Sequence, residues 1–136
     1  MTIPTVLRNL GNLCNGSTPL GLVLGLVGRG RFRRRGSLVV VDGVRLPLVD
    51  AAACTVGSVV LVPGRSLEDA EARIPTLLAH EEEHAWQYAY CLGLPFLPLY
   101  GLATLWSLRR TRHRALGNAF EVQAGLTSGG YRPTAA

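Results

Sequence analysis

The chain has 136 residues, of which 48% are hydrophobic and 17% are charged. This length and apolar content are typical of one packed domain and exclude a disordered protein. All 14 basic residues are arginine, and with nine acidic residues they give a formal charge of +5. We expect a single domain over residues 1–136, divided into an N-terminal apolar segment (1–36) and a core (37–136).

The three cysteines, Cys14, Cys54 and Cys91, lie far apart and form no C-x-x-C pair. This spacing excludes a disulfide scaffold and a zinc ribbon, and it indicates small buried thiols in a reducing compartment. The apolar run at 20–27 is followed by a basic block, which is the reverse of a secretory signal. We therefore expect a cytoplasmic protein, with a peripheral position at the membrane as an alternative.

The first 28 residues predict two apolar helical segments. Apolar residues recur at helical spacing over 5–13, which indicates a short amphipathic helix. Residues 20–27 are apolar on all sides and include Gly21 and Gly25, which suits a buried helix or one that dips into a membrane. This run is too short to span a bilayer.

Most of the arginines fall in two blocks, each directly after an apolar stretch. For the first block we favour a solvated basic loop over a patch that contacts lipid or RNA. An anionic membrane surface suits both blocks at least as well as nucleic acid, which is the weaker candidate partner. The two blocks comprise Arg31, Arg33, Arg34 and Arg35, and then Arg109, Arg110, Arg112 and Arg114.

β-Branched residues predict three strands in the middle of the chain. Residues 37–41 indicate a strand that closes at Asp42-Gly43, a strong hairpin signal, and 44–49 would form the return strand. Residues 55–62 carry the strongest strand pattern in the chain. We expect these strands to form a small antiparallel sheet.

Helices dominate the second half of the chain. Ser66 and Asp69 form a capping-box pattern that predicts a short helix through residue 72. The next helix should begin near residue 74 and end before Gly93, a suitable C-terminal glycine. Residues 92–108 contain no charge, and two prolines predict a loop and a shorter helix there. We favour a buried apolar hairpin over a segment that rests on the membrane.

The central feature is the run His80-Glu81-Glu82-Glu83-His84. Two histidines four residues apart on a helix lie on one face, so both imidazoles can reach one cation. A glutamate directly after the first histidine lies beside that face. This is the H-E-x-x-H arrangement of zinc peptidases. The alternative is a polar, solvated helix turn with two exposed histidines. Glu82 and Glu83 add negative charge before the second histidine.

A catalytic zinc site generally has three protein ligands, so one ligand remains to be found. Downstream of the motif the chain has one acidic residue, Glu121, and one histidine, His113. Glu121 lies in an apolar predicted helix at 118–126, where an unpaired carboxylate would be costly to bury. A metal would supply the partner, and a salt bridge to an arginine is the alternative. His113 lies between two arginines, which would repel a metal ion.

This arrangement predicts hydrolysis of a peptide bond. Zinc would lower the pKa of a water molecule to about 7, and Glu81 would take its proton. The substrate is expected to pair with an exposed edge strand. The residues of that strand would be Thr55, Val56, Gly57, Ser58 and Val59. The candidates for stabilising the transition state are Tyr131 and His113.

The stretch from Cys54 to Tyr131 resembles small bacterial gluzincin-like metallopeptidases, including the domain found with contractile injection systems. The whole chain is similar to an actinobacterial family of the same design. The resemblance rests on Thr55-Val56-Gly57, on Leu78-Ala79-His80-Glu81-Glu82-Glu83-His84 with Gln87, on Gly93-Leu94-Pro95-Phe96-Leu97-Pro98-Leu99-Tyr100, and on Asn118, Glu121 and Ala124.

The resemblance implies a minimal zincin-like α+β fold, with a small antiparallel sheet packed on the motif helix and a second helix that carries the third ligand. It implies one Zn²⁺ per chain, bound by His80, His84 and Glu121, with Glu81 as general base and a peptide or protein as substrate. The alternative is a zincin-like module without catalysis, with a binding or structural role that includes association with a membrane.

Overall fold

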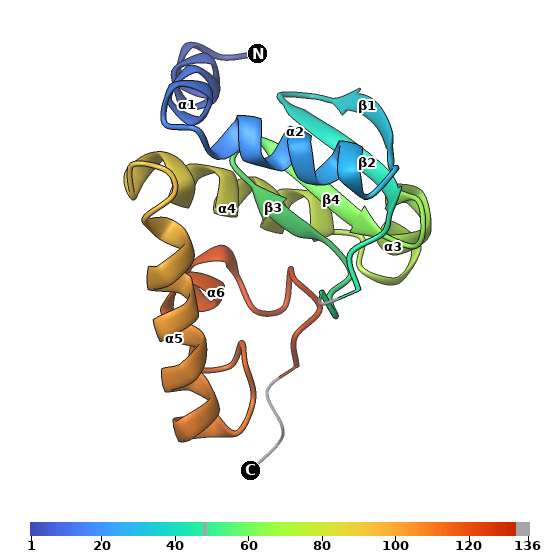
Figure 1. Ribbon diagram of the computed structural model, residues 1–136. Helices are drawn as coiled ribbons and strands as arrows, with labels where there is room; N and C mark the ends of the chain where they lie inside the picture. Colours follow the sequence, from blue (N-terminus) through green and yellow to red (C-terminus); the bar gives the residue numbers. More distant parts are fainter. Residues whose placement is uncertain (48, 133–136) are drawn as a thin grey trace.

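The computed structural model describes residues 1–47 and 49–132, which form six helices and a four-stranded sheet (Figure 1). The helices are α1 (Ile3–Cys14), α2 (Ser17–Val27), α3 (Leu67–Arg73), α4 (Leu77–Tyr90), α5 (Phe96–Thr111) and α6 (Ala119–Ala124). The strands are β1 (Arg31–Arg35), β2 (Leu38–Val44), β3 (Cys54–Val56) and β4 (Val59–Pro63). The predicted α+β class is confirmed.

The sheet is mixed, with strand order β1-β2-β4-β3. β1 is antiparallel to β2, and β3 is antiparallel to β4, but the two central strands β2 and β4 run parallel. The expectation of a purely antiparallel sheet is therefore wrong. The reason lies in the connection after β2, which passes back through the edge strand β3. β4 consequently returns beside β2 in the same direction.

The first hairpin turns at Gly36-Ser37, between β1 and β2. Gly36 adopts φ +58°, a left-handed conformation that glycine accepts without strain. The expected turn residues Asp42 and Gly43 instead lie inside β2, at a shift in its register with β4. The predicted hairpin at Asp42-Gly43 is thus wrong, and the described part of 44–49 contains no strand beyond Val44.

The strand expected at 55–62 is a second hairpin. Gly57 adopts φ +66° and, with Ser58, forms the turn between β3 and β4. The apolar pattern runs through this turn without a break, because both strands are buried. The apolar pattern of residues 55–62 alone therefore could not show that they form two strands.

The first arginine block forms β1 and is not the solvated loop that we expected. Arg33 pairs with Asp42 (2.5 Å) and Glu68 (2.6 Å), and Arg35 pairs with Glu68 (2.9 Å) and Glu71 (3.4 Å). These contacts connect β1 to α3 along one side of the sheet. Two of the four arginines in this block therefore have carboxylate partners within the chain.

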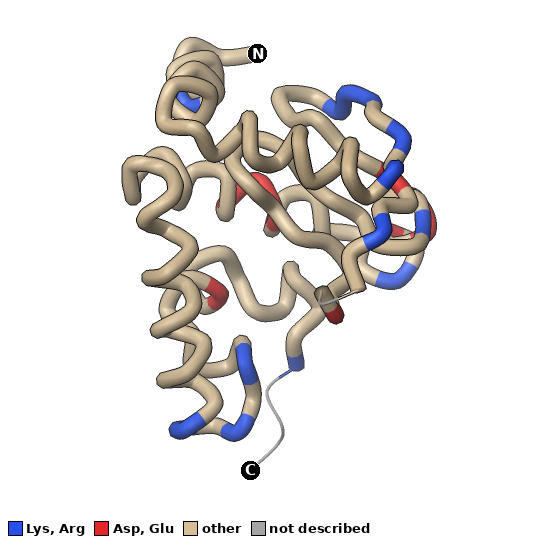
Figure 2. Tube along the Cα trace, viewed as in Figure 1, with Lys and Arg blue, Asp and Glu red and all other residues tan. Residues whose placement is uncertain are grey.

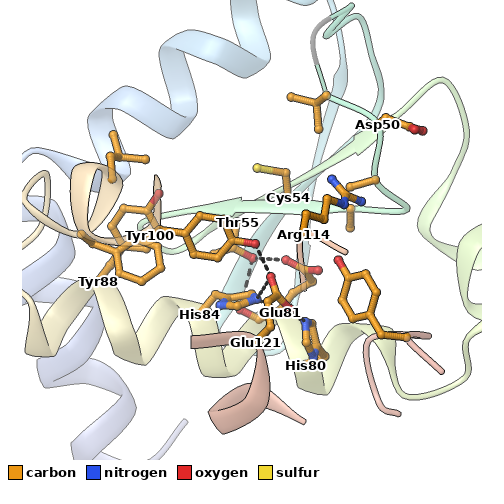
Figure 3. Close-up of a pocket in the computed structure, with 16 residues that line it drawn as sticks. Asp50, Cys54, Thr55, His80, Glu81, His84, Tyr88, Tyr100, Arg114 and Glu121 are labelled. Carbon is orange, nitrogen blue, oxygen red and sulfur yellow. Dashed lines mark hydrogen bonds and ion pairs between the residues drawn. The ribbon is translucent and has the colours of Figure 1, made fainter. Parts of the chain in front are cut away.

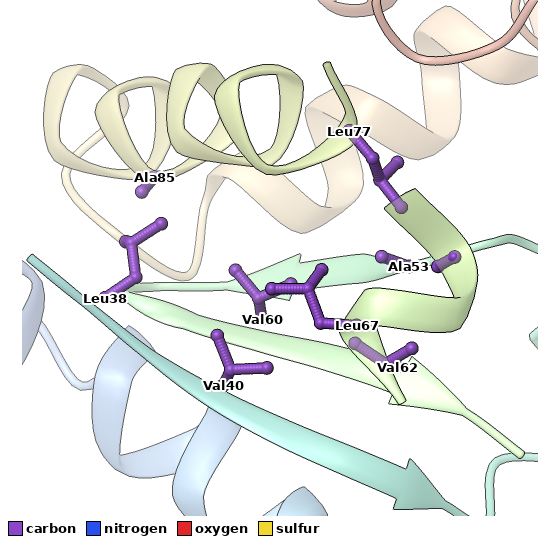
Figure 4. Close-up of a cluster of buried hydrophobic side chains, with 9 residues drawn as sticks. Leu38, Val40, Ala53, Val60, Val62, Leu67, Leu77 and Ala85 are labelled. Atoms are coloured by element: carbon purple, nitrogen blue, oxygen red, sulfur yellow. The ribbon is translucent and has the colours of Figure 1, made fainter. Parts of the chain in front are cut away.

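The sheet lies between two layers of helices (Figure 1). Successive side chains of β2 and β4 point to opposite faces, so both faces are buried. One face packs against α3 and α4 through the cluster in Figure 4: Leu38, Val40, Ala53, Val60, Val62, Leu67, Ala70, Leu77 and Ala85. The other face packs against α2 and the residues around α5, through Val41, Val44, Val56, Val59, Leu61, Tyr88 and Phe96.

Glycines on the inner side of α2 let this helix approach the sheet closely. A Cβ atom on Gly21 would lie 2.5 Å from the Val56 backbone oxygen and 2.8 Å from Val59 Cβ. Gly21→Ala should therefore lower the free energy of unfolding by about 1–3 kcal/mol, because backbone atoms cannot move aside easily. Gly11→Ala, on the exposed side of α1 with no atom in the way, should raise it by up to about 1 kcal/mol. Urea titrations of both variants test this prediction, and equal effects would contradict the close approach.

α1 turns its polar side toward the protein. Its buried residues are Arg8 and Asn12, and Asn12 donates hydrogen bonds to the Ala85 carbonyl of α4 (2.9 Å) and to Ser58 Oγ (3.2 Å). The apolar residues on the other side are exposed, and they are Ile3, Val6, Leu7, Leu10 and Leu13. The predicted amphipathic helix is present, but its orientation is the reverse of that of a core helix.

α5 contains most of the uncharged stretch 92–108. It is 16 residues long, and Pro98 lies in its first turn, where proline is tolerated. The expected loop and shorter helix are present, with the loop at 92–95 and the helix from Phe96 onward, although Pro98 does not interrupt it. The buried hairpin is wrong, because only Phe96 and Ser107 are buried in α5. Six large apolar side chains of α5 are exposed, and they are Leu97, Leu99, Leu102, Leu105, Trp106 and Leu108.

In the part of the chain that the structure describes, no individual helix has the length and apolar character needed to cross a membrane. α1 and α2 reach that length and composition only as a pair, and the pair is bent by 72°. The segment at 20–27 lies within α2. Its inner side is buried as expected of a buried helix, whereas Val23, Leu26 and Val27 are exposed.

Candidate metal centre

α4 carries the H-E-x-x-H motif beside the edge strand β3. It begins at Leu77, three residues later than expected, because Ile74 still caps α3. His80 and His84 lie one turn apart on the same side of α4, and both are buried. Their Nε2 atoms are 3.2 Å apart. The shared face predicted for the two histidines is therefore confirmed.

α6 brings Glu121 to the same point. Asn118 caps this short helix by accepting a hydrogen bond from the Phe120 backbone N–H. Glu121 Oε2 lies 3.0 Å from His80 Nε2, and Oε1 lies 3.4 Å from His84 Nε2. The ligand atoms of all three residues lie within 4.8 Å of one another. The structure thus brings together a buried His-His-Glu group that could hold a metal ion (Figure 3).

Both imidazoles use their Nδ1 atoms for contacts outside this group. His80 Nδ1 donates to the Gly125 carbonyl (2.9 Å), and His84 Nδ1 donates to Gln87 Oε1 (2.8 Å). The amide nitrogen of Gln87 donates to the Phe120 carbonyl (2.9 Å), which turns the amide oxygen toward His84. These contacts orient the two rings and leave a lone pair on each Nε2 atom when the imidazoles are neutral.

The Nε2 atoms of neutral His80 and His84 and the carboxylate of Glu121 are therefore all acceptors, and they face one another with no donor among them. Glu121 Oε2 is buried and has no hydrogen-bond partner among the described residues. Such a group is unfavourable unless positive charge lies between the acceptors. Ligands at 2.0–2.1 Å from a tetrahedral ion would be about 3.3 Å apart. The observed contacts of 3.0–3.4 Å, in which each imidazole approaches a different oxygen of Glu121, are close to this value, so the residues present fit a metal ion.

The electrostatics of the group also favour a cation. Burial opposes ionisation of Glu121, but the nearby imidazoles of His80 and His84, together with the Tyr100 hydroxyl, outweigh it and lower the pKa of the carboxyl. Burial acts to lower the pKa of His84, yet Glu121 and Glu81 outweigh it and raise this pKa above its ordinary value. The group therefore keeps a carboxylate and attracts positive charge.

Glu81 lies beside the three ligands and is buried. Its Oε2 accepts a hydrogen bond of 2.6 Å from Thr55 Oγ1 on β3. Burial raises the pKa of Glu81, against the opposing effects of His84, Thr55 and His80. A raised pKa suits a carboxylate that has to accept a proton near neutral pH.

Sequence reasoning missed Tyr100 as a site residue. Its hydroxyl donates a hydrogen bond to Glu121 Oε1, which holds the carboxylate from the side of α5. Burial raises the pKa of Tyr100, and the charge of Glu121 adds to this shift, so the hydroxyl stays protonated. One signal was present, since Tyr100 is the only tyrosine in the uncharged stretch 92–108.

A cavity of about 240 Å³ lies beside the three ligands. Of the two candidates for stabilising the transition state, Tyr131 lines this cavity and His113 does not. His113 is exposed, and its ring lies beside that of Tyr131, with 5.9 Å between ring centroids. The sequence also missed Asp50 and Arg114, which line the cavity wall beside Cys54 (Figure 3).

The expected substrate strand lies only partly at the sheet edge. Thr55 and Val56 belong to the edge strand β3, and the backbone N–H and C=O of Thr55 point to its open side, because Val56 pairs with Val59 next to the turn. Gly57 and Ser58 form the turn, and Val59 belongs to β4, which has a partner strand on each side. The last three residues of the predicted edge are therefore wrong.

The two extra glutamates of the motif do not crowd the metal ligands. Glu82 points away from them and accepts a hydrogen bond of 2.8 Å from Arg8 of α1. Glu83 is exposed. The negative charge that the sequence places next to the histidines is thus directed to the other sides of α4.

The expectation of three buried thiols is wrong for Cys14, which is exposed. Cys54 and Cys91 are partly buried, and Cys54 lines the cavity. Burial, together with the charge of Glu81, raises the pKa of Cys54 to about 12. At neutral pH this side chain is therefore a thiol and not a thiolate.

No protein-family model, curated protein or solved structure matches this chain. The fold and the site described here therefore rest on the chain's own geometry, and the resemblance to gluzincin-like peptidases remains a hypothesis.

Proposed function

We propose that this chain is a zinc-dependent hydrolase that cleaves peptide bonds in a peptide or protein substrate. The observation that carries the proposal is the buried group of His80, His84 and Glu121, in which the two Nε2 atoms and the two carboxylate oxygens make contacts of 3.0–3.4 Å. Two imidazoles and one carboxylate form a ligand set typical of catalytic zinc, and three protein ligands leave one position open for water.

A bound zinc ion would supply Lewis acidity that lowers the pKa of a water molecule to about 7. Glu81 would accept the proton of that water, and Thr55 would hold the Glu81 carboxylate in place through its 2.6 Å hydrogen bond. Gly125 and Gln87 would keep the imidazoles of the two ligands in orientation, since they accept the hydrogen bonds of both Nδ1 atoms.

The shape of the site supports an extended peptide as substrate. The open side of β3 offers the backbone groups of Thr55 next to the ligands, where a substrate strand would add to the sheet. Tyr131 supplies a hydroxyl to the same cavity, whereas the hydroxyl of Tyr100 already donates to Glu121. Tyr131 is therefore the side chain that we assign to stabilisation of the transition state.

The purified chain should contain about one zinc ion per molecule. A chelator should abolish cleavage of a diverse peptide library, and added zinc should restore it. Metal analysis and mass spectrometry of the peptide products measure the two outcomes. A folded protein that takes up no zinc would contradict the metal site. A zinc-loaded protein that cleaves no peptide would instead indicate a metal-binding module without catalysis.

A further inference from the structure

α1 presents to solvent the side that a core helix would bury. Its contacts with the rest of the protein are made by polar residues, notably Arg8, Asn9 and Asn12. On the opposite side, Ile3 is 79% exposed and Leu7 is 63% exposed. Leaving a row of apolar side chains in water is unfavourable, at about 25 cal/mol per Å². Hydrogen bonds fix α1 with its apolar side in solvent. This orientation indicates that an apolar partner outside the chain covers that side.

α1 and α5, which both carry several exposed apolar residues, lie on the same side of the molecule, at the left in Figure 1. The loop before α5 lies against the bend between α1 and α2, since a Cβ atom on Gly93 would be 2.4 Å from Asn15 Cγ. Leu92, in that loop, is 77% exposed. The exposed apolar side chains of α1, this loop and α5 are called the apolar face below.

Charge is distributed in a way that matches the surface of a membrane. The apolar face carries no charged residue, because Arg8 is the only charge in residues 1–28 and it points inward, and 92–108 has none. Arginines begin where α5 ends, at Arg109 and Arg110 (Figure 2). Arg110 lies 5.2 Å above the ring of the exposed Trp106. Uncharged apolar residues bordered by tryptophan and arginine are typical of segments at the lipid interface.

We propose that the apolar face binds the surface of an anionic phospholipid membrane, with α1 and α5 in contact with the acyl chains and Arg109 and Arg110, in the last turn of α5, in contact with the headgroups. The face offers no charged group that would select a protein partner, whereas its bordering arginines complement anionic lipid. The carboxylate partners of Arg33 and Arg35 make the first arginine block the weaker lipid contact. This inference goes beyond the proposed hydrolase function, and its readout does not depend on a metal.

Flotation of the full chain with vesicles tests the proposal. The wild type should float with vesicles of phosphatidylcholine and phosphatidylglycerol. Leu7→Glu and Leu102→Glu should each weaken binding by about ten-fold or more, because each removes a leucine from the lipid contact. The matched control is Ala72→Glu, which adds the same charge at an exposed position of α3 on the far side, and it should stay within about two-fold of the wild type. Circular dichroism confirms that each variant is folded.

The arginines are tested separately. Arg109→Gln and Arg110→Gln should each weaken binding to the anionic vesicles by about five-fold and leave binding to pure phosphatidylcholine unchanged. A wild type that does not float overturns the proposal. So does a wild type that forms a dimer which Leu7→Glu dissociates, without flotation, because the face would then bind a second copy. Flotation that both leucine variants retain would also overturn it, since the arginines alone would bind the membrane.

Discussion

Glu81→Gln should lower the rate of peptide cleavage by about 10²–10⁴-fold while leaving the zinc content unchanged. The amide cannot accept the proton of the attacking water, but its oxygen can still accept the hydrogen bond from Thr55 that the structure shows. Glu81 makes none of the three short contacts between ligand atoms, so the metal should remain bound. Measurements of kcat/KM and of zinc content on one preparation give both results together.

Glu121→Gln is the matched control, because it makes the same chemical change at a second buried carboxylate of the site. This variant removes a ligand, so its affinity for zinc should fall by more than about 100-fold and its activity should fall with it. Loss of zinc from both variants would show that Glu81 is itself needed to bind the metal. Full activity of Glu81→Gln would show that Glu81 is not the general base.

Glu82→Ala should lower the free energy of unfolding by about 3 kcal/mol, which is large for a partly exposed residue. The partner of Glu82 is Arg8, whose side chain is fully buried and donates to Glu82 at 2.8 Å and to Ser37 at 2.8 Å. Removing the carboxylate leaves this buried guanidinium without an anion. Arg8→Met should cost less, because Glu82 is 37% exposed and water can solvate it. Guanidinium titrations of both variants measure the difference.

Two controls separate this pair from a general effect of charge. Glu83→Ala, at the neighbouring exposed glutamate, should change stability by no more than about 0.5 kcal/mol.

The second control is the pH dependence of the pair. Burial acts to raise the pKa of Glu82, but hydrogen bonds from Arg8 and Ser37 outweigh it and lower the pKa. The pair therefore contributes fully above about pH 4.5 and loses its contribution as the pH falls through the folded-state pKa. A difference between wild type and Glu82→Ala that stays constant down to low pH would contradict this account.

The His-His-Glu group that could hold a metal ion was predictable from the sequence, because its chemistry is local or scarce. His80 and His84 share a helix face by spacing alone, and Glu121 was the one acidic residue left downstream. Tyr100 could not be predicted as a site residue, because its contact with Glu121 depends on how α5 and α6 pack. Arg114 was placed with the lipid-facing arginines, although its side chain lines the cavity.

The helices were predicted more successfully than the sheet. Apolar spacing located α1, and the capping pair Ser66 and Asp69 located α3, since both signals lie within one helix. The hairpin turns depended on which glycine adopts a positive φ: Gly57 lies inside the predicted strand 55–62, and Gly36 follows an arginine block that has no strand pattern. An amphipathic pattern also shows which residues share a side of α1, but not which side meets the protein.

The contacts of α1 determine the shortest fragment of this chain in which the histidine motif would keep its position. Asn12 and Arg8 bind the back of α4 at Ala85 and Glu82, within one turn of His84. A fragment that starts at residue 37 would lose these two contacts, together with β1 and the helix that covers one face of the sheet. We therefore expect residues 1–36 to belong to the same cooperative unit as the His-His-Glu group, and trimming them should not yield a minimal domain.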